Sequence, residues 1–469
     1  MRLKGPSPEV RAALEKRGLE DVLEPAFRSG PRAAASLAAE LEALDWKMLD
    51  RQRSRLGVPA GKPPEGLEPP PLAPPSTAGG LAVASPALEA GWEALRAGRV
   101  AVVTVAGGQA SRLGFQGPKG AFPLGPVTGA SLFQILAGKV RRLGELAACP
   151  LPWILQTGPG NHSETQAFFE RRNFFGLPIR DLRFVCQGTF PALSPQGGLL
   201  LASPGSLFRN PDGHGGCFRA LYRSGTLDWL RERGVSQVYY CQVDNPLARV
   251  GDPAFLGRHV LAHADMSVKV VEKIDPGEKV GLVVRREGRT LCIEYSDLDP
   301  RLGALRDPDG GLRFRAGNIA IHVFDLDFLE RMATGGGLPL HLARKKVLAL
   351  GEGLEPEIRE GIKFEQFVFD ALPQARTVVV QLCERAEEFA PVKNRHGIDS
   401  IDTSQGALRA QAARWAAGLF PAQEGSSANE PWEIRPGVAW GPEDLRTRKP
   451  LLRRTFGGRL LVLQRSVDP

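Results

Sequence analysis

Apolar and polar positions follow two different rhythms along the chain. In residues 1–57, which are rich in Ala, Leu, Glu and Arg, Leu37, Leu41 and Leu44 recur at the spacing of one helix face. A short β-branched run at 100–105 opens a second rhythm, in which such runs alternate with helical stretches. Runs of this kind are typical of buried strands in a parallel sheet. The pattern therefore predicts helices first and an α/β core afterwards.

The alternation continues through the middle of the chain and argues for a mostly parallel sheet. The further strands are expected at 153–156, 238–242, 267–272 and 319–324. The further helices are expected at 88–98, 131–146, 165–173, 253–263 and 328–333. Residues 280–286 and 290–295 flank Glu287-Gly288-Arg289, which predicts a β-hairpin set into the core.

Two changes of composition predict the domain boundaries. Residues 59–80 are rich in proline, which lacks an N–H donor and fixes φ, so they are expected to form an extended connector. Near the end, 432–438 and 459–465 are strand-like segments among prolines and glycines. We therefore expect a helical region with its connector at 1–98, a catalytic core at 99–396 and a small β-rich unit at 397–469.

Composition and charge exclude several classes of protein. Of 469 residues, 42% are hydrophobic and 24% charged, as in a soluble globular chain, and no apolar run approaches the ~18 residues that a membrane span needs. The net charge of +8 favours an anionic ligand. The chain contains no run of five Lys or Arg of the kind that would indicate nucleic-acid binding. Arg2 and Lys4 precede no apolar stretch, and the six cysteines form no Cys-x-x-Cys pair, so we expect a cytoplasmic protein. Oligomeric state stays open.

The strongest candidate for chemistry follows the strand at 100–105. There the chain reads Val105-Ala106-Gly107-Gly108-Gln109-Ala110-Ser111-Arg112-Leu113-Gly114, and then Pro118-Lys119-Gly120. Ligands of open α/β sheets bind beyond the carboxyl ends of the strands, and glycines let backbone N–H groups approach phosphate oxygens. The segment matches neither the Walker A motif nor the Gly-x-Gly-x-x-Gly fingerprint. It predicts a phosphate site with two cations, Arg112 and Lys119.

This segment resembles the Gly-Gly-x-Gly-Thr-Arg-Leu-Gly…Pro-Lys-Gly signature of the UDP-sugar pyrophosphorylase family, most closely its UDP-N-acetylglucosamine branch. Eight further segments resemble that branch in the same order, so that the likeness spans about residues 100–396. They begin at Gln187, Pro211, Val243, Val270, Glu294, Ala316, Gly361 and Glu388. The resemblance implies a Rossmann-like nucleotidyltransferase core that joins UTP and an N-acetylhexosamine 1-phosphate into a UDP-sugar and pyrophosphate, with Mg²⁺ as cofactor.

The resemblance also implies roles for individual residues. Val105, Ala106, Gly107 and Gly108 would hold the nucleotide through their backbone, and Arg112 and Lys119 would neutralise its phosphates. Gln187 and Gly213 would read the uracil, and Asp244 would hold Mg²⁺ together with phosphate oxygens. His214, Glu294, Tyr295 and Asn318 would contact the sugar, and Lys363 and Lys393 would reach the phosphates from the far side. The catalytic set would be Arg112, Lys119 and Lys393.

Several of these residues also have an ordinary structural explanation. Asp244-Asn245 could form a turn after a strand, Gly213 could be a tight turn, and Lys363 could be a solvated lysine at a helix end. The chain also departs from the family at Ala110, where the family has glycine, and at His214, where it has asparagine. If φ were positive at Ala110, strain of about 1 kcal/mol or more would follow.

These departures leave three functions open. The first is the N-acetylhexosamine enzyme, and the second is a pyrophosphorylase for a non-acetylated sugar such as glucose or galactose 1-phosphate. The third is a UDP-sugar-binding protein with little turnover. The imidazole of His214 offers one donor and one acceptor when neutral, so it could partly replace an amide while changing which sugar fits.

Overall fold

The computed structural model describes residues 5–57, 65–78, 81–417, 419, 432–448, 452–457 and 460–465. The chain forms two compact units, each built from three separate stretches. The smaller unit contains Met1–Lys62, Gln187–Cys217 and Leu338–Val368, and the larger contains Pro63–Cys186, Phe218–Gly337 and Phe369–Pro469. The three-part division expected from the sequence stays a prediction.

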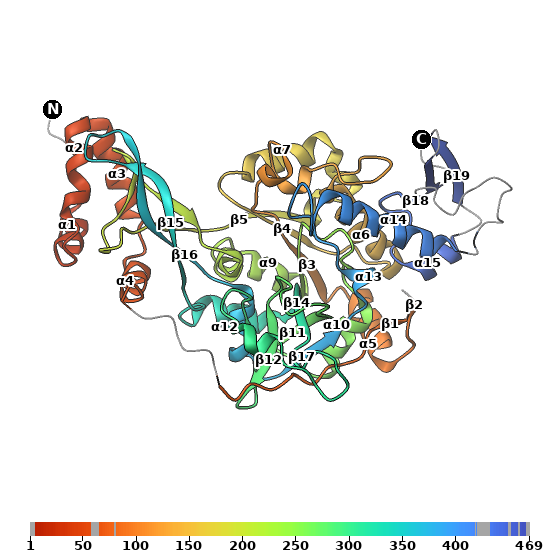
Figure 1. The fold of residues 1–469 in the computed structure, drawn as a ribbon. Coiled ribbons are helices and arrows are strands. Elements are labelled where there is room, and N and C mark those ends of the chain that lie inside the picture. The colour runs from red at the N-terminus through yellow and green to blue at the C-terminus, as the bar shows by residue number, and fades with distance from the viewer. Residues whose placement is uncertain are drawn as a thin grey trace. The chain divides into compact units, whose positions relative to one another are not determined.

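A nine-stranded mixed sheet forms the centre of the larger unit (Figure 1). Its parallel part has the order β10-β3-β4-β5, with β10 at Gln237–Gln242, β3 at Val100–Val105, β4 at Trp153–Thr157 and β5 at Leu182–Cys186. The residues of β3 and β4 are buried except for half-buried Val105, as the apolar runs predict. The carboxyl ends of these strands share one edge of the sheet.

The antiparallel part of the sheet is built around one long strand, β14 at Ala316–Asp325. This strand pairs with β10, with β11 at Met266–Glu272 and with β12 at Leu282–Arg286. The hairpin of β12 with β13, Arg289–Ile293, is confirmed, and β17 at Val378–Leu382 pairs parallel with β11. The α/β class is therefore confirmed.

Helices of the larger unit pack around this sheet, and several begin at a capping side chain. They are α5 Pro86–Arg96, α6 Leu132–Ala147, α7 His162–Arg171, α9 Thr226–Glu232, α10 Pro253–Leu261, α11 Pro300–Gly303 and α12 Leu326–Thr334, while α8 Cys217–Arg223 begins in the smaller unit. Glycines set the α5–α10 crossing, because a Cβ on Gly91 would lie 1.7 Å from the Pro253 carbonyl oxygen.

The C-terminal part of the larger unit is mixed in structure. It contains the helices α13 Arg385–Glu388, α14 Ile401–Ala416 and α15 Pro442–Thr447, and the strands β18 Trp432–Ile434, β19 Leu452–Gly457 and β20 Leu460–Arg465. The three strands form a separate sheet in the order β18-β20-β19. Two of them, β18 and β20, fall within the strand-like segments, whereas the sequence pattern does not predict β19. Residue 459, the first of the predicted segment 459–465, lies outside the described residues. A two-residue pair, β1 Thr77–Ala78 with β2 Leu81–Ala82, precedes α5.

The smaller unit contains the predicted N-terminal helices and a hairpin that the sequence pattern does not predict. The helices are α1 Pro8–Glu15, α2 Glu24–Ser29, α3 Pro31–Glu42 and α4 Trp46–Ser54. The hairpin joins β15 His341–Leu350 to β16 Pro356–Glu365, and the short strands are β6 Thr189–Pro191, β7 Leu201–Ser203, β8 Ser206–Leu207 and β9 Arg209–Pro211. Leu37, Leu41 and Leu44 share one buried cluster with Ile362 and Phe364, so the apolar stripe is core.

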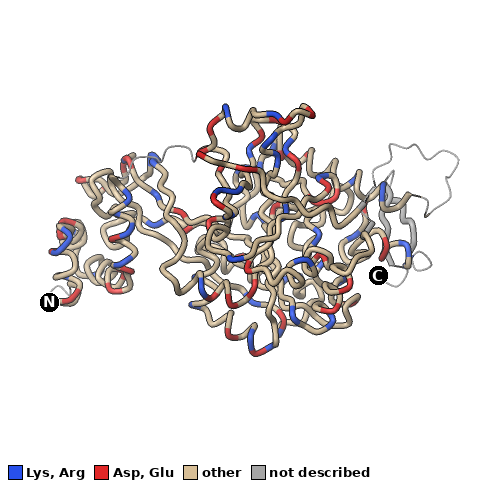
Figure 2. The backbone as a smooth tube through the Cα atoms, turned by 90° about the horizontal axis from the view of Figure 1, so that it is seen from below, with Lys and Arg blue, Asp and Glu red and all other residues tan. Residues whose placement is uncertain are grey.

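Charges of both signs are interspersed over the described parts of both units (Figure 2). None of the six cysteines forms a disulfide. Within the described residues, no helix combines the length and the apolar character that crossing a bilayer would require.

Candidate active site

The loop after β3 presents backbone donors at the carboxyl edge of the parallel strands. The N–H of Ala106 still donates to the Gln156 carbonyl oxygen of β4, 2.7 Å away. In the described part of the chain, the N–H groups of Gly107 and Gly108 have no protein acceptor. Backbone N–H groups without a partner at such an edge are suited to bind the oxygens of a phosphate.

Ala110 does not carry the strain that its Cβ could have caused. Its φ is −93° and its side chain is buried in the main core cluster. The positive φ values of this loop fall on Gly114 and Gly117 instead. Alanine is therefore accommodated without cost at the position where the resembling family has glycine.

Arg112 lies in the short 3-10 helix Ser111–Leu113 and is exposed. Among the described residues it has no ion-pair partner. A second cation lies beside the same turn, because Nη1 of Arg395 is 3.3 Å from the position that a Cβ on Gly114 would occupy. The guanidinium of Arg395 therefore lies against the same loop that carries Arg112.

Lys119 and Asp244 meet across two parallel strands. The N–H of Lys119 donates to the Gly108 carbonyl oxygen at 3.0 Å, which fixes Lys119 to the loop after β3. Asp244 follows β10, the neighbour of β3, and its Oδ2 lies 2.9 Å from Nζ of Lys119. Both side chains are mostly shielded from water, with exposed fractions of 17% and 13%. The two predicted residues are therefore brought together.

The segment that carries Lys393 runs beside Asp244. The N–H of Val392 donates to the Asp244 carbonyl oxygen at 2.9 Å, and the carboxamide of Asn245 bonds the carbonyl of Glu388 and the N–H of Ala390. Nζ of Lys393 lies 3.5 Å from Oδ2 of Asp399. The backbone next to Lys393 therefore lies beside Asp244, while the Lys393 ammonium faces Asp399.

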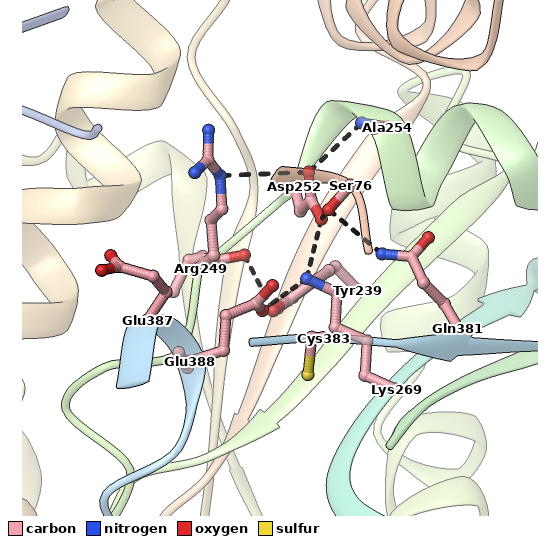
Figure 3. A network of polar contacts seen from close by, with 12 residues as sticks. Ser76, Tyr239, Arg249, Asp252, Ala254, Lys269, Gln381, Cys383, Glu387 and Glu388 are labelled. Carbon is pink, nitrogen blue, oxygen red and sulfur yellow. Dashed lines mark hydrogen bonds and ion pairs between the residues drawn. The ribbon is translucent and has the colours of Figure 1, made fainter. Parts of the chain in front are cut away.

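A buried ion network includes Glu388, which lies at the start of the segment that leads to Lys393 (Figure 3). Nζ of Lys269 lies 2.7 Å from Asp252 Oδ2 and 2.5 Å from Glu388 Oε2, and all three side chains are nearly inaccessible. Burial disfavours the ammonium, but the two carboxylates outweigh it and raise the Lys269 pKa. Burial raises the Glu388 pKa. For Asp252, Lys269 and Arg249 outweigh burial and lower the pKa.

The predicted sugar contacts lie at the start of β14 and the end of β13. Nδ2 of Asn318 lies 3.7 Å from Sγ of Cys292, and its Oδ1 accepts the Ala320 N–H at 2.9 Å, where the strand has a positive φ of 54°. Glu294 directly follows β13, and Tyr295 is 46% exposed. Asn318 and Glu294 therefore share one region, while a sugar-binding role for them and for Tyr295 stays a prediction.

Four predicted residues lie in the smaller unit. The Asp212 N–H donates to the Gly188 carbonyl oxygen at 3.1 Å, which brings Gln187 and Gly213 close together. Gly213 has a φ of 82°, and a Cβ there would lie 2.5 Å from the Gln366 carbonyl oxygen, so glycine is required structurally. Whether Gln187 and Gly213 also read the base stays a prediction.

His214 and Lys363 are held by neighbours within the same unit. Nδ1 of His214 accepts the Val368 N–H at 3.1 Å, and the ring stacks on Phe367. Burial, and to a lesser degree His341, lowers the His214 pKa to about 4, so the imidazole is neutral. Lys363 lies on β16 rather than at a helix end, with Nζ 5.6 Å from the Phe208 ring centroid.

The acidic residues of the described chain do not form a metal cage. No group of three or more His, Cys, Asp or Glu side chains is arranged to hold an ion there. Asp244 is a carboxylate beside the phosphate-type loop, with Oδ2 bonded to Lys119. A second carboxylate, Glu164, lies at the far turn of the same loop, with Oε1 2.7 Å from the position that a Cβ on Gly117 would occupy. A single carboxylate fits Mg²⁺ only where phosphate oxygens and water complete the shell.

Two residues near the loop after β3 are not apparent from the sequence. Arg395 lies two positions beyond Lys393, but nothing in the chain pattern places it against Gly114. Asn161 follows β4, and its carboxamide binds the carbonyl oxygens of Ala106 and Gly108. The only local signal is the Gly158-Pro159-Gly160-Asn161 turn after a buried strand, which reads as an ordinary helix start.

Comparisons with known proteins agree with this geometry. A family model described as UTP–glucose-1-phosphate uridylyltransferase matches residues 85–406. The chain is 37% identical over 338 residues to a probable UDP-N-acetylglucosamine pyrophosphorylase of Dictyostelium discoideum, covering 68% of this chain and 69% of the relative. It is 36% identical over 433 residues to the human UDP-N-acetylhexosamine pyrophosphorylase-like protein 1, covering 87% and 85%.

A solved structure extends the likeness to the whole chain. The uridine diphosphate N-acetylglucosamine pyrophosphorylase of Trypanosoma brucei, crystallised with an inhibitor, is 25% identical, with a TM-score of 0.83 over 99% of this chain and 100% of that one. The resemblance found in the sequence motifs is thereby confirmed. The chain belongs to the UTP–glucose-1-phosphate uridylyltransferase family and is a uridylyltransferase.

Proposed function

We propose that this uridylyltransferase transfers the uridylyl group of UTP to an N-acetylhexosamine 1-phosphate, most specifically N-acetylglucosamine 1-phosphate, and releases pyrophosphate. The observation that carries the proposal is the grouping of backbone donors and cations at one edge of the sheet. The group consists of the N–H groups of Gly107 and Gly108, which have no acceptor among the described residues, together with Arg112 and the Lys119–Asp244 pair. The relatives named as N-acetylhexosamine enzymes support the choice of sugar.

The reaction needs positioning and charge neutralisation more than proton transfer. The attacking group is a sugar-phosphate oxygen that is already anionic, so no general base and no covalent nucleophile are required. The loop after β3 would bind the triphosphate through its N–H groups, and Arg112 would hold the leaving pyrophosphate. Lys119, held against Asp244, and Lys393 would neutralise charge that develops at the α-phosphate during in-line attack.

Mg²⁺ is part of the proposal because one carboxylate stands where the triphosphate would bind. Asp244 would hold the ion through its carboxylate oxygens, and phosphate oxygens and water would supply the remaining ligands. When bound, the ion would neutralise phosphate charge. In this structure the Lys119 ammonium, 2.9 Å away, orients Asp244 through a hydrogen bond to Oδ2.

The sugar and base contacts follow from the resemblance and from neighbours within each unit. Glu294, Tyr295 and Asn318 would contact the sugar, and Gln187 and Gly213 would read the uracil, with Lys363 reaching the phosphates. His214 presents a neutral ring whose Nδ1 is already an acceptor for Val368. A neutral imidazole carries one donor and one acceptor, so it would offer a sugar a different set of hydrogen bonds from those of an asparagine amide.

The state of the cysteines supports a proposal for the cellular compartment of the enzyme. Six cysteines without a disulfide are usual in a reducing compartment, so we propose a cytoplasmic enzyme. Its partners would be small anionic substrates. The excess of 60 Lys and Arg over 52 Asp and Glu is modest and agrees with phosphorylated metabolites rather than nucleic acid.

Pyrophosphate release from UTP, measured with a panel of sugar 1-phosphates, tests the proposal. We expect release with N-acetylglucosamine 1-phosphate and much slower release with glucose or galactose 1-phosphate. Faster release with a non-acetylated sugar would support the second enzyme. Binding of a UDP-sugar without any pyrophosphate release would make the chain a binding protein of low turnover, a possibility that His214 motivates.

A further inference from the structure

One side chain fixes the backbone that carries the predicted phosphate donors. Asn161 is 2% exposed and lies between β4 and α7, facing the loop after β3. Its Nδ2 donates to the Ala106 carbonyl oxygen at 2.8 Å and to the Gly108 carbonyl oxygen at 3.1 Å. Its Oδ1 accepts the Gly158 N–H at 2.8 Å, so the carboxamide is fully engaged and cannot rotate without losing a bond.

These bonds decide where the loop's N–H groups point. In a planar trans peptide the C=O and the N–H point in opposite directions. Because the carbonyls of Ala106 and Gly108 face Asn161, the N–H groups of Gly107 and Gln109 face away from it. The Gly107 carbonyl oxygen lies on the same side, since a Cβ on Gly158 would be only 2.8 Å from it, and the Gly108 N–H therefore also faces away.

The position of Asn161 makes this arrangement unusual. Asn161 is the N-cap of α7, where asparagine normally accepts an N–H of the first helical turn, yet its side chain makes no capping bond. Its backbone oxygen alone accepts the Thr165 N–H. A second hydrogen bond joins the same two segments, because Nε2 of exposed Gln109 donates to the Gly160 carbonyl oxygen at 2.8 Å. The side chain serves the neighbouring loop instead of its own helix.

We propose that Asn161 is a positioning residue for nucleotide binding, which holds the carbonyls of the 106–108 loop on one side so that three successive N–H groups face the triphosphate. The inference rests on the proposed function. It assigns no substrate contact to Asn161, which acts only through the loop. It explains why a polar, fully bonded side chain is buried beside a glycine pair whose N–H groups have no acceptor among the described residues.

Asn161→Asp separates this role from helix capping. Aspartate caps a helix as well as asparagine does and keeps an oxygen for Gly158, but it loses both donors and sets a carboxylate against two carbonyl oxygens. We expect calorimetric titration to show UTP and pyrophosphate binding weakened about tenfold or more in Asn161→Asp and Asn161→Ala. The KM for the sugar 1-phosphate at saturating UTP should stay within about twofold of wild type, because the loop does not hold the sugar.

Gln52→Ala is the matched control for a lost buried carboxamide. Nε2 of Gln52 donates to the Pro191 carbonyl oxygen at 3.2 Å in the smaller unit, and its side chain is fully buried. Gln52→Ala should lower the unfolding temperature while UTP affinity stays close to wild type. If Asn161→Ala and Gln52→Ala lower UTP affinity equally, the effect is general destabilisation and the proposal is overturned.

The UTP affinities of the Asn161 variants and of the wild-type protein give further outcomes that test the proposal. Wild-type UTP affinity in Asn161→Asp would mean that the two N–H donors of Asn161 do not position the loop, and the proposal would be overturned. If that variant does not fold, wild-type affinity in Asn161→Ala overturns the proposal equally. A wild-type protein that binds UTP but releases no pyrophosphate would refute the proposed function, while the comparison of UTP affinities would still test Asn161. A wild-type protein that does not bind UTP would overturn both.

Discussion

Nζ of Lys119 and Oδ2 of Asp244 lie 2.9 Å apart, although 125 positions separate the residues. The pair joins the loop after β3 to the loop after β10, and the two strands are parallel neighbours. The ammonium balances the charge of the carboxylate, and it lies at the carboxyl edge of the parallel strands, where a triphosphate would bind. Arg112, exposed and without an ion-pair partner in the described chain, complements it as a cation whose charge is not already balanced.

Arg112→Ala and Lys119→Ala should therefore differ in their effect on stability but not on turnover. We expect each to lower kcat by about 10²-fold, because each removes a cation from developing phosphate charge. Arg112→Ala should change the free energy of unfolding by less than about 0.5 kcal/mol, as exposed substitutions usually do. Lys119→Ala should cost more, because Asp244 is left unpaired in a mostly shielded position.

Steady-state kinetics and urea unfolding on the same preparations check this expectation. Arg286→Ala, which removes an exposed arginine at the β12–β13 hairpin, is the matched control and should leave both quantities unchanged. Turnover within a few-fold of wild type in both Arg112→Ala and Lys119→Ala would remove these residues from the catalytic set.

Asp244→Asn tests the metal role while keeping a hydrogen-bond acceptor for Lys119. The asparagine oxygen can still accept from Lys119, whereas the negative charge that attracts Mg²⁺ is lost. We expect the Mg²⁺ concentration for half-maximal activity to rise by about tenfold or more. Asp327→Asn, an exposed carboxylate 83% accessible to solvent, is the control and should titrate as wild type does. An unchanged titration in Asp244→Asn would contradict the assignment.

The rhythm of the core could be predicted from sequence because each element carries its own signal. The run at 100–105 is almost entirely buried, and the hairpin around Gly288 has the expected turn. The β15–β16 hairpin could not be predicted, since Arg344, Lys345 and Lys346 interrupt β15 with exposed polar residues. The smaller unit joins three distant stretches of chain, and such long-range contacts leave no local pattern.

The site divides in the same way. The motifs identify Arg112, Lys119 and Asp244 individually, but the Lys119–Asp244 ion pair depends on two strands being neighbours in the sheet. Asn161 escapes sequence analysis because an asparagine before a helix reads as a cap. The strain considered at Ala110 could not be decided before φ was known, and its value of −93° removes it.

Arg395 should contribute to binding the leaving pyrophosphate, because its guanidinium lies against Gly114, in the loop that carries Arg112. We expect Arg395→Ala to raise the KM for pyrophosphate in the reverse reaction by up to about tenfold. The effect should shrink with added salt, since the side chain is exposed. Arg395→Lys should retain part of the affinity for pyrophosphate, because lysine keeps the positive charge but lacks the planar guanidinium that can donate two parallel N–H bonds to a phosphate. Equal KM values for all three proteins would exclude Arg395 from the site.

His214→Asn should change sugar preference more than stability. An asparagine oxygen can replace Nδ1 as acceptor for the Val368 N–H, so the local backbone should stay in place. The smaller amide should shift preference toward N-acetylglucosamine 1-phosphate, measured as the ratio of kcat/KM for this substrate over glucose 1-phosphate. A ratio identical to that of wild type would separate His214 from substrate choice.

His259 predicts how stability changes with pH. Its ring is 2% exposed, with Nδ1 2.8 Å from Ser267 Oγ, and burial, only partly opposed by Asp265, lowers the His259 pKa to about 4. Between about pH 6.5 and 4 the unfolded chain takes up a proton here that the folded chain does not, so stability falls as the pH falls.

At pH 5 this single group should cost the folded state about 2 kcal/mol relative to pH 7. In His259→Gln the loss of unfolding free energy between pH 7 and 5 should be smaller than in wild type by about that amount. Urea unfolding of both proteins at the two pH values measures it, and other titrating groups cancel in the comparison. Parallel losses in the two proteins would mean that His259 is already protonated, or freely hydrated, in the folded state.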